Sequence, residues 1–214
     1  MKRYVTALTI AGSDPSGGAG IQADLKTFSA LGVYGATAIT AVTVQNTQSV
    51  KYVHKLPPQV VYDQIVAVME DVTVDAVKIG MVNDAETLDA IVRALTAYRS
   101  KFLVVDPVMV STSGCALMQP DALAIMKERL LPMADLVTPN LPEAWTLAGT
   151  DTSVDDAAQA ILRLGVKALL IKGGHAEGNT KTDYLYIYKG EGVKRVEFTA
   201  ETIDTPNTHG TGCT

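Results

Sequence analysis

The residues best able to do chemistry stand directly after short runs of β-forming residues. The first is a glycine-rich segment, residues 12–20, which follows an apolar run over residues 5–11 and opens a helical pattern. Its glycines would let backbone N–H groups approach a ligand closely, and a helix start favours anionic or polar groups. The segment has neither the Gly-Lys-Ser/Thr ending of a P-loop nor a GxGxxG spacing. A tight turn therefore explains it equally well, and Asp24, one helical turn further on, could be only a partner of the helix dipole.

Charged side chains follow three later runs. Asp106 precedes a proline and could hold a cation, although an Asp before a proline is also a common turn residue. Asn140 and Glu143 stand three residues apart, which suits hydrated Mg²⁺ with phosphates but suits a helix capping box better. Lys172 is followed by two glycines and supplies a positive charge for a phosphate, whereas His175 is expected to be only a loop residue.

Two further side chains suit the recognition of a flat heterocycle. Gln45 follows the second β-forming run, and its carboxamide can donate and accept hydrogen bonds at the edge of a heteroaromatic ring. Met81 follows the third run and could form a soft wall against such a ring, although methionine more often fills a core.

The chain closes on Asn-Thr-His-Gly-Thr-Gly-Cys-Thr, residues 207–214. Consecutive N–H groups around Gly210 and Gly212 could form an anion-binding nest, and Cys213 could act there as a thiolate or base. The alternative is a glycine-rich tail with an incidental thiol. Since a nest normally leads into a helix, we expect this chain to lack a C-terminal helical segment.

Composition bounds the class of protein. With 214 residues, 47% hydrophobic and 19% charged, the chain suits one α/β domain over residues 1–214. A net charge of -5 argues against nucleic-acid binding. Cys115 and Cys213 form no metal or disulfide pattern, which favours a reduced, cytoplasmic setting. No apolar run reaches about 18 residues, so we expect no membrane span.

Hydrophobic periodicity alternates between strands and helices along the chain. Strands are predicted over residues 5–11, 37–44, 76–79, 102–105, 136–138 and 168–171, with a hairpin from 184–188 and 193–198. Helices are predicted over residues 21–31, 58–72, 85–98, 121–131, 142–148 and 154–164. This order predicts a mostly parallel sheet with helices on both faces, and ligands beyond the carboxyl ends of its strands.

Taken together, these segments closely resemble the hydroxymethylpyrimidine/phosphomethylpyrimidine kinases. The resemblance covers nearly the whole chain and rests on ordered motifs over residues 7–27, 43–47, 78–81, 106–109, 138–143, 172–175 and 207–214. It implies a ribokinase-like fold, a homodimer, and ATP-dependent phosphorylation of 4-amino-5-hydroxymethyl-2-methylpyrimidine and then of its monophosphate, in thiamin biosynthesis.

The resemblance also implies roles for individual residues. Gln45 would hydrogen-bond the aminopyrimidine, in a ring pocket lined by Gly12, Asp24, Val44, Met81 and Val108. Mg²⁺ and the ATP phosphates would be served by Asp106, Asn140, Glu143 and Lys172, with Asp106 and Glu143 as metal ligands. The transferring phosphoryl group would lie against Thr208, Gly210, Thr211 and Gly212, beside Cys213 as the base.

Two rival functions stay open. A pyridoxine or pyridoxal kinase of the same fold would differ mainly at the ring edge, where Gln45 and Met81 would decide. A non-catalytic ligand-binding module would bind the pyrimidine without releasing ADP.

Overall fold

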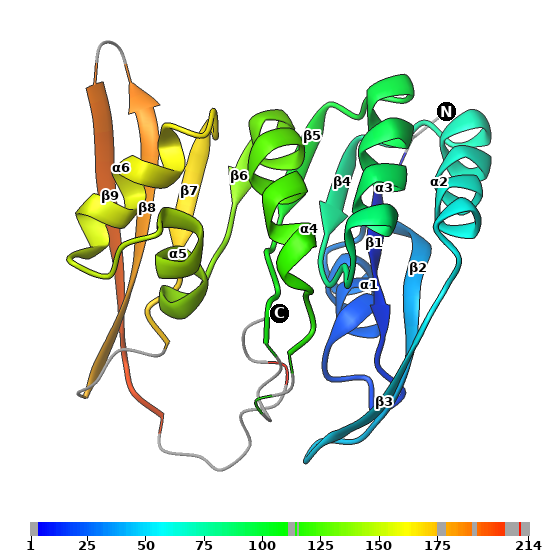
Figure 1. Cartoon of the computed structure of the whole chain (residues 1–214), viewed down its shortest axis with the longest axis horizontal. Helices are drawn as coiled ribbons and strands as arrows, with labels where there is room; N and C mark the ends of the chain where they lie inside the picture. The colour runs from blue at the N-terminus through cyan, green and yellow to red at the C-terminus, as the bar shows by residue number, and fades with distance from the viewer. Residues whose placement is uncertain are drawn as a thin grey trace.

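The computed structural model describes residues 4–110, 114, 116–174, 179–189, 192–203 and 210. These residues form one sheet in the order β3-β2-β1-β4-β5-β6-β7-β8-β9 (Figure 1). The strands are β1 (Thr6–Ser13), β2 (Tyr34–Gln45), β3 (Val50–Lys55), β4 (Ala76–Ile79), β5 (Phe102–Val105), β6 (Leu136–Val137), β7 (Ala168–Ile171), β8 (Thr180–Lys189) and β9 (Gly192–Glu201). The helices are α1 (Gly20–Ala30), α2 (Pro58–Asp71), α3 (Ala85–Ala97), α4 (Pro120–Ile125), α5 (Leu141–Ala148) and α6 (Val154–Leu162).

The sheet is parallel in its centre and antiparallel at both edges. β2, β1, β4, β5, β6 and β7 run parallel, whereas β3 pairs antiparallel with β2, and β8 and β9 continue antiparallel from β7. The predicted α/β fold with a hairpin late in the chain is confirmed. Because the central strands share one direction, their carboxyl ends meet along one edge of the sheet.

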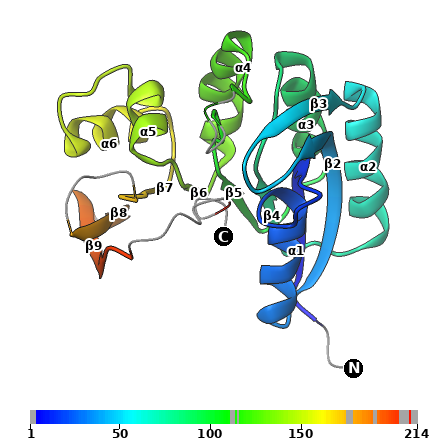
Figure 2. The same ribbon diagram turned by 90° about the horizontal axis from the view of Figure 1, so that it is seen from below.

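Helices cover both faces of the sheet, as Figure 2 shows. Helix α1 lies on one face, and α2 to α6 lie on the other. The strand β1 shows the alternation that produces this layering: Thr9 bonds to a side chain of α1, whereas Leu8 and Ile10 join the core cluster that includes Val61 and Ile65 of α2. All three β1 side chains have no exposed surface, which is expected of a parallel strand buried on both faces.

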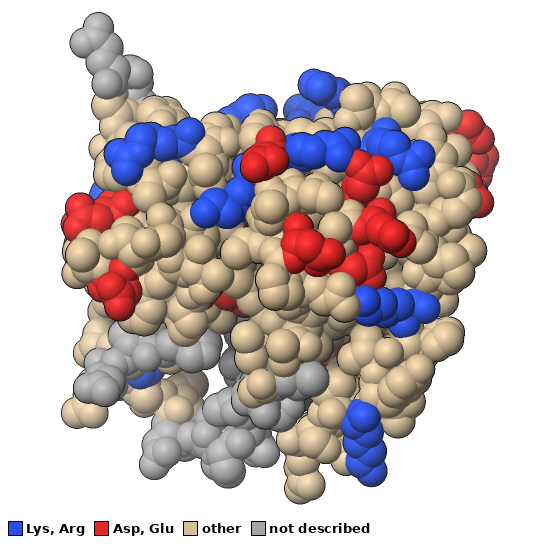
Figure 3. All heavy atoms as spheres, in the orientation of Figure 1, with Lys and Arg blue, Asp and Glu red and all other residues tan. Residues whose placement is uncertain are grey.

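On the face formed by α2 to α6, acidic and basic side chains lie side by side (Figure 3). Asp89 of α3, for example, is paired both with Arg93 on the same helix and with Arg129. No helix among the described residues is long and apolar enough to cross a membrane.

Three predicted strands, β4, β5 and β7, are matched at both ends, and most other elements differ by one to four residues at one end or both. The predicted helix over residues 121–131 changes its geometry instead of running on. It continues after α4 as a π-helical turn, η1 (Met126–Leu130), and a 3₁₀ turn, η2 (Leu131–Met133). Pro132 has no N–H to donate, so the α-helical ladder cannot extend through it.

The strand β3 was not predicted. It pairs with β2 from Ala41 to Gln45 and forms a two-stranded ribbon. The last pair between β1 and β2 joins Ser13 to Val42, so the tip of this ribbon extends past the end of β1 (Figure 1). Gln45 therefore lies at the tip of a ribbon beside the carboxyl edge of the sheet.

Candidate active site

Backbone hydrogen bonds align the residues that follow the parallel strands. Gly80 donates to Ile10 O (3.0 Å), and Asp106 donates to Ile79 O (2.8 Å). Lys172 donates to Pro139 O (2.8 Å) and forms a parallel bridge with Asn140. These bonds continue the sheet one step beyond its strands, so that the predicted polar residues share its carboxyl edge.

A buried charged cluster lies at this edge beyond β5 and β7. Asp106 is 4% exposed, and its Oδ1 accepts hydrogen bonds from Lys172 Nζ (2.8 Å) and from Thr138 Oγ1 (3.1 Å). No described residue is seen to donate to Asp106 Oδ2. The structure thus joins two predicted site residues that are 66 positions apart.

Asn140 and Glu143 form the capping box that their spacing favoured. Asn140 Oδ1 accepts from the N–H of Glu143, and Glu143 Oε2 accepts from the N–H of Asn140, both at 2.9 Å. Glu143 Oε1 also accepts a longer bond of 3.3 Å from the N–H of Met109. Burial, as the main cause, and the nearby Asp106 charge raise the pKa of Glu143, against the lowering effect of the Asn140 N–H and of Lys172. The cap therefore places a second carboxylate close to Asp106.

These donors fit a magnesium ion shared with phosphates. Mg²⁺ prefers hard oxygen ligands and usually takes one or two carboxylates, with waters and substrate phosphates completing its shell. Within the described ranges there is no group of three or more His, Cys, Asp or Glu side chains that could hold a metal by themselves. Two carboxylates beside the Lys172 ammonium therefore match a magnesium ion whose shell is completed by waters and substrate phosphates.

An apolar wall lies next to the charged cluster. Met81 packs with Ala41 and Leu117, and Val53 and Val108 pack against them. A Cβ on Gly12 would lie 2.3 Å from Met81 Cε, so the absence of a side chain there makes room for the methionine. Three predicted ring-pocket residues, Gly12, Met81 and Val108, are thereby brought together, and Val53 links them to the β2–β3 ribbon.

The glycine-rich loop after β1 is organised around its own carboxylate. Asp14 is 1% exposed and accepts from the N–H groups of Ser16 (2.8 Å), Gly18 (3.0 Å) and Ala19 (2.9 Å). We expected this loop to offer its N–H groups to a ligand. For these three groups the expectation is wrong, because an acidic side chain of the loop itself already takes them.

Gly210, in the last predicted motif, lies against Gly18 in the glycine-rich loop after β1. Its φ is +79°, and a Cβ there would lie 1.8 Å from the carbonyl oxygen of Gly18. The backbone of Gly210 therefore touches the loop that opens α1. The other predicted residues of that motif, Thr208, Thr211, Gly212 and Cys213, lie outside the described residues, as does His175.

Asp24 is held by two side chains that the sequence did not single out. Its carboxylate accepts from Thr9 Oγ1 (2.5 Å) and, through both oxygens, from Lys78 Nζ (2.9 and 3.1 Å). Asp24 and Lys78 are 5% and 17% exposed. The available signals were a lysine inside the otherwise apolar strand Ala76–Ile79 and its place at the start of the motif over residues 78–81.

Gln45 and Val44 are the predicted residues that the structure does not draw into these clusters. Gln45 pairs with Val50 and Val44 with Tyr52 in the ribbon, and Val44 is 52% exposed. Their backbone lies beside the site, and no described side-chain contact joins them to Met81 or Asp106.

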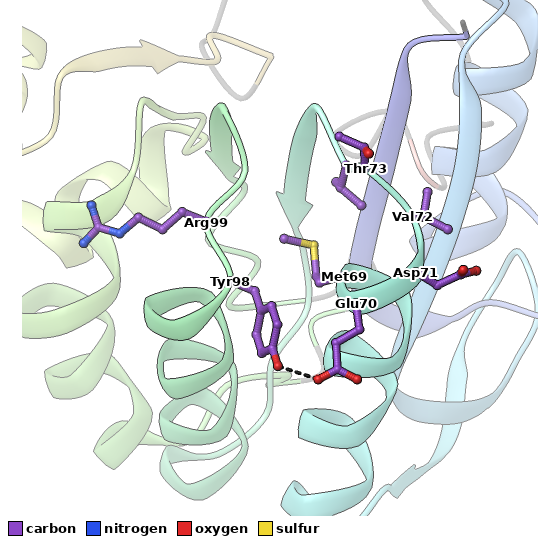
Figure 4. Close-up of a pocket in the computed structure, with 8 residues that line it drawn as sticks. Met69, Glu70, Asp71, Val72, Thr73, Tyr98 and Arg99 are labelled. Carbon is purple, nitrogen blue, oxygen red and sulfur yellow. Dashed lines mark hydrogen bonds between the residues drawn. The ribbon is translucent and has the colours of Figure 1, made fainter.

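Two surface hollows lie away from this edge. One, of about 320 Å³, is lined by the end of α2 and the loop before β4, together with Tyr98 and Arg99 (Figure 4). There the Tyr98 hydroxyl donates to Glu70 at 2.5 Å. The other, of about 350 Å³, is lined by residues of α2, α3 and α4. Neither contains a predicted site residue.

Comparison with known proteins places this geometry in a family. The family model for phosphomethylpyrimidine kinase matches residues 14–214. A hydroxymethylpyrimidine/phosphomethylpyrimidine kinase of Rhizobium meliloti (strain 1021) is 53% identical over 213 residues, which cover 97% of this chain and 78% of that protein. The protein of the same name from Escherichia coli (strain K12) is 47% identical over an alignment that covers 100% of this chain and 80% of that protein.

Solved structures agree on the fold. The phosphomethylpyrimidine kinase of Clostridium difficile 630 superposes with a TM-score of 0.79 at 48% identity, covering 89% of this chain and 83% of that one. The pyridoxal kinase of Staphylococcus aureus, solved with AMP-PCP and pyridoxal, gives a TM-score of 0.83 at 35% identity, covering 99% and 77%.

The fold, and a site of carboxylates and a lysine beside an apolar wall, are those of a ribokinase-like small-molecule kinase. Within that class, the chain belongs to the phosphomethylpyrimidine kinase family.

Proposed function

We propose that this protein transfers the γ-phosphoryl group of ATP to 4-amino-5-hydroxymethyl-2-methylpyrimidine, and then to the resulting monophosphate, as a step of thiamin biosynthesis. The observation that carries the proposal is the ion pair of the buried Asp106 with Lys172, beside the buried Glu143, at the edge where the Met81–Val108 wall ends. A charged site for phosphates thus adjoins an apolar site for a flat ring.

The charged cluster would hold the nucleotide. Lys172 would donate to an ATP phosphate and Asn140 would fix the helix start, while Asp106 Oδ2 and Glu143 would be the protein ligands of Mg²⁺. The ion, when bound, neutralises charge on the phosphates. Because Lys172 and Thr138 both bond Oδ1, the Asp106 carboxylate is held in one orientation before substrate arrives.

The apolar wall would hold the pyrimidine ring. Gly12, Met81 and Val108 would contact its faces, with Val44 and Asp24 completing the pocket. Gln45 would hydrogen-bond the ring edge from the tip of the β2–β3 ribbon.

The transfer step needs an acceptor oxygen aligned with the γ-phosphorus. The substrate hydroxymethyl oxygen would form the new O–P bond as the bond from the γ-phosphorus to ADP breaks, and its proton would pass to the Cys213 thiolate. Gly210 and Gly212, with Thr208 and Thr211, would surround the group in transit. Because phosphoryl transfer depends chiefly on alignment and charge stabilisation, the loop matters at least as much as the base.

A pyridoxal kinase activity is the second candidate. The structural relatives solved with ADP, or with AMP-PCP and pyridoxal, are pyridoxal kinases, and their TM-scores reach 0.85 at 35–38% identity. The higher identity to the pyrimidine kinases, up to 53%, makes the pyrimidine the first choice.

ADP production separates these functions. We expect turnover with the pyrimidine alcohol and with its monophosphate, and a kcat/KM for pyridoxal at least tenfold lower. Faster turnover of pyridoxal would replace the proposal with the second candidate. Pyrimidine binding without ADP release would instead identify a non-catalytic binding module. The homodimer and the cytoplasmic location stay predictions from the sequence.

A further inference from the structure

Asp24 is assigned above to the ring pocket, but its ion pair with Lys78 has no role in the phosphoryl transfer. Both side chains are mostly buried, at 17% and 5% exposure, between α1 and the sheet. A buried ion pair is a poor source of stability, because removing two charges from water offsets most of their attraction. A well-packed apolar pair would serve the core equally well, so this pair calls for another explanation.

The pair adjoins two segments that carry predicted site residues. A Cβ on Gly80 would lie 3.0 Å from Lys78 Nζ, so this glycine leaves room for the ammonium beside the residue that precedes Met81. Asp24 follows Gly20 by four residues, about 6 Å along the helix axis. Gly18, just before that helix, touches Gly210 of the phosphoryl-binding loop.

The two proposed substrates differ in charge at the group that accepts the phosphate. The pyrimidine alcohol carries no phosphate, whereas a phosphate monoester carries about -1.5 to -2 charges at neutral pH. The proposed function places Asp24 in the ring pocket, so an unpaired Asp24 carboxylate would repel the second substrate more than the first. Lys78 cancels that charge through a contact to both carboxylate oxygens.

We propose that Lys78 is a specificity-determining residue, which neutralises Asp24 so that one pocket accepts both the neutral alcohol and its anionic monophosphate. The inference rests on the proposed function. At an effective dielectric constant of about 20 and a separation of about 10 Å, one unpaired charge changes the affinity for the monophosphate by about tenfold or more.

The test is the ratio of KM for the monophosphate to KM for the alcohol, measured in four proteins. Lys78→Met should raise this ratio about tenfold, and Asp24→Asn should lower it, because the two variants leave opposite charges unpaired. The double variant Lys78→Met/Asp24→Asn should return the ratio to within about threefold of the wild-type value. Thr9→Val is the matched control, since it removes a hydrogen bond to Asp24 without changing any charge.

If the ion pair had a purely structural role, the variants would weaken the binding of both substrates equally and leave the ratio of their KM values unchanged. If Lys78→Met does not fold, the lower ratio in Asp24→Asn and its recovery in the double variant still decide the matter. Unchanged ratios in the folded single variants, or a double variant that keeps the Lys78→Met ratio, would overturn the inference. A wild-type protein inactive on both pyrimidines would instead refute the proposed function.

Discussion

Gly210→Ala tests whether the last motif must lie against the first loop. In the structure, a Cβ at this position would lie 1.8 Å from Gly18 O and 2.6 Å from Gly18 C, where at least 3.0 Å is required. Both atoms belong to backbone, so no flexible side chain can yield. The backbone at Gly210 or at Gly18 must therefore move by more than 1 Å.

The expected loss follows from that displacement. A shift of about 1 Å in a catalytic group can lower the rate about a hundredfold. The positive φ of 79° adds about 1 kcal/mol of backbone strain for a residue with a Cβ. We expect kcat to fall about a hundredfold in an ADP-release assay, while the pyrimidine affinity measured by calorimetry changes less than threefold.

Gly149→Ala separates the contact from the strain. Gly149 has a φ of +71°, but a Cβ there would meet nothing within 4 Å. This control should lose about 1 kcal/mol of stability and keep its turnover. A Gly210→Ala protein with near-normal kcat, or a Gly149→Ala protein with an equal loss, would show that turnover does not depend on the close approach of Gly210 to Gly18.

Three further changes address the cluster, the wall and a helix cap. Asp106→Asn should lower kcat/KM at least a hundredfold, since it removes the charge that pairs with Lys172; activity above a tenth of wild type would contradict this. Met81→Ala should raise KM for the pyrimidine at least fivefold with little change in KM for ATP, because Met81 belongs to the apolar wall; equal changes in both would count against that wall. Asp84→Ala should reduce the free energy of unfolding in urea by about 1 kcal/mol at pH 7, since Asp84 accepts from the N–H of Thr87 at the start of α3. Burial opposes ionisation of Asp84, but the hydrogen bonds from Thr87 and Lys55 outweigh it and lower the pKa of Asp84. The stabilisation is therefore present above about pH 4 and is lost as the pH falls through the lower folded pKa. A difference in unfolding free energy between wild type and Asp84→Ala that grew in acid would exclude this explanation.

Most of the sheet could be predicted because its strands are short apolar runs bounded by polar or glycine residues. β4, β5 and β7 were placed to the residue on that pattern. β3 was missed because this edge strand is not an apolar run. Its residues Lys51, Tyr52 and His54 are all exposed. Its formation depends on pairing with β2, which a local pattern does not contain.

The site was predicted in outline and missed in detail for a similar reason. The capping box of Asn140 and Glu143 is local, and its spacing was sufficient to favour it. The pairing of Lys78 with Asp24 joins positions 54 residues apart and depends on α1 lying across the sheet. The role of Asp14 within its own loop needed the folded backbone, since its bonds depend on how residues 16 to 19 turn around it.

The edge beyond β4, β5 and β7 is proposed to transfer phosphate to a pyrimidine alcohol. Phosphorus NMR of the protein with ATP, Mg²⁺ and 4-amino-5-hydroxymethyl-2-methylpyrimidine tests this directly. We predict loss of the ATP γ-phosphate signal and growth of a phosphate monoester signal, followed by signals of a diphosphate ester. ATP that stays unchanged beside saturating pyrimidine, or a monoester that forms only when pyridoxal is supplied, would contradict the account.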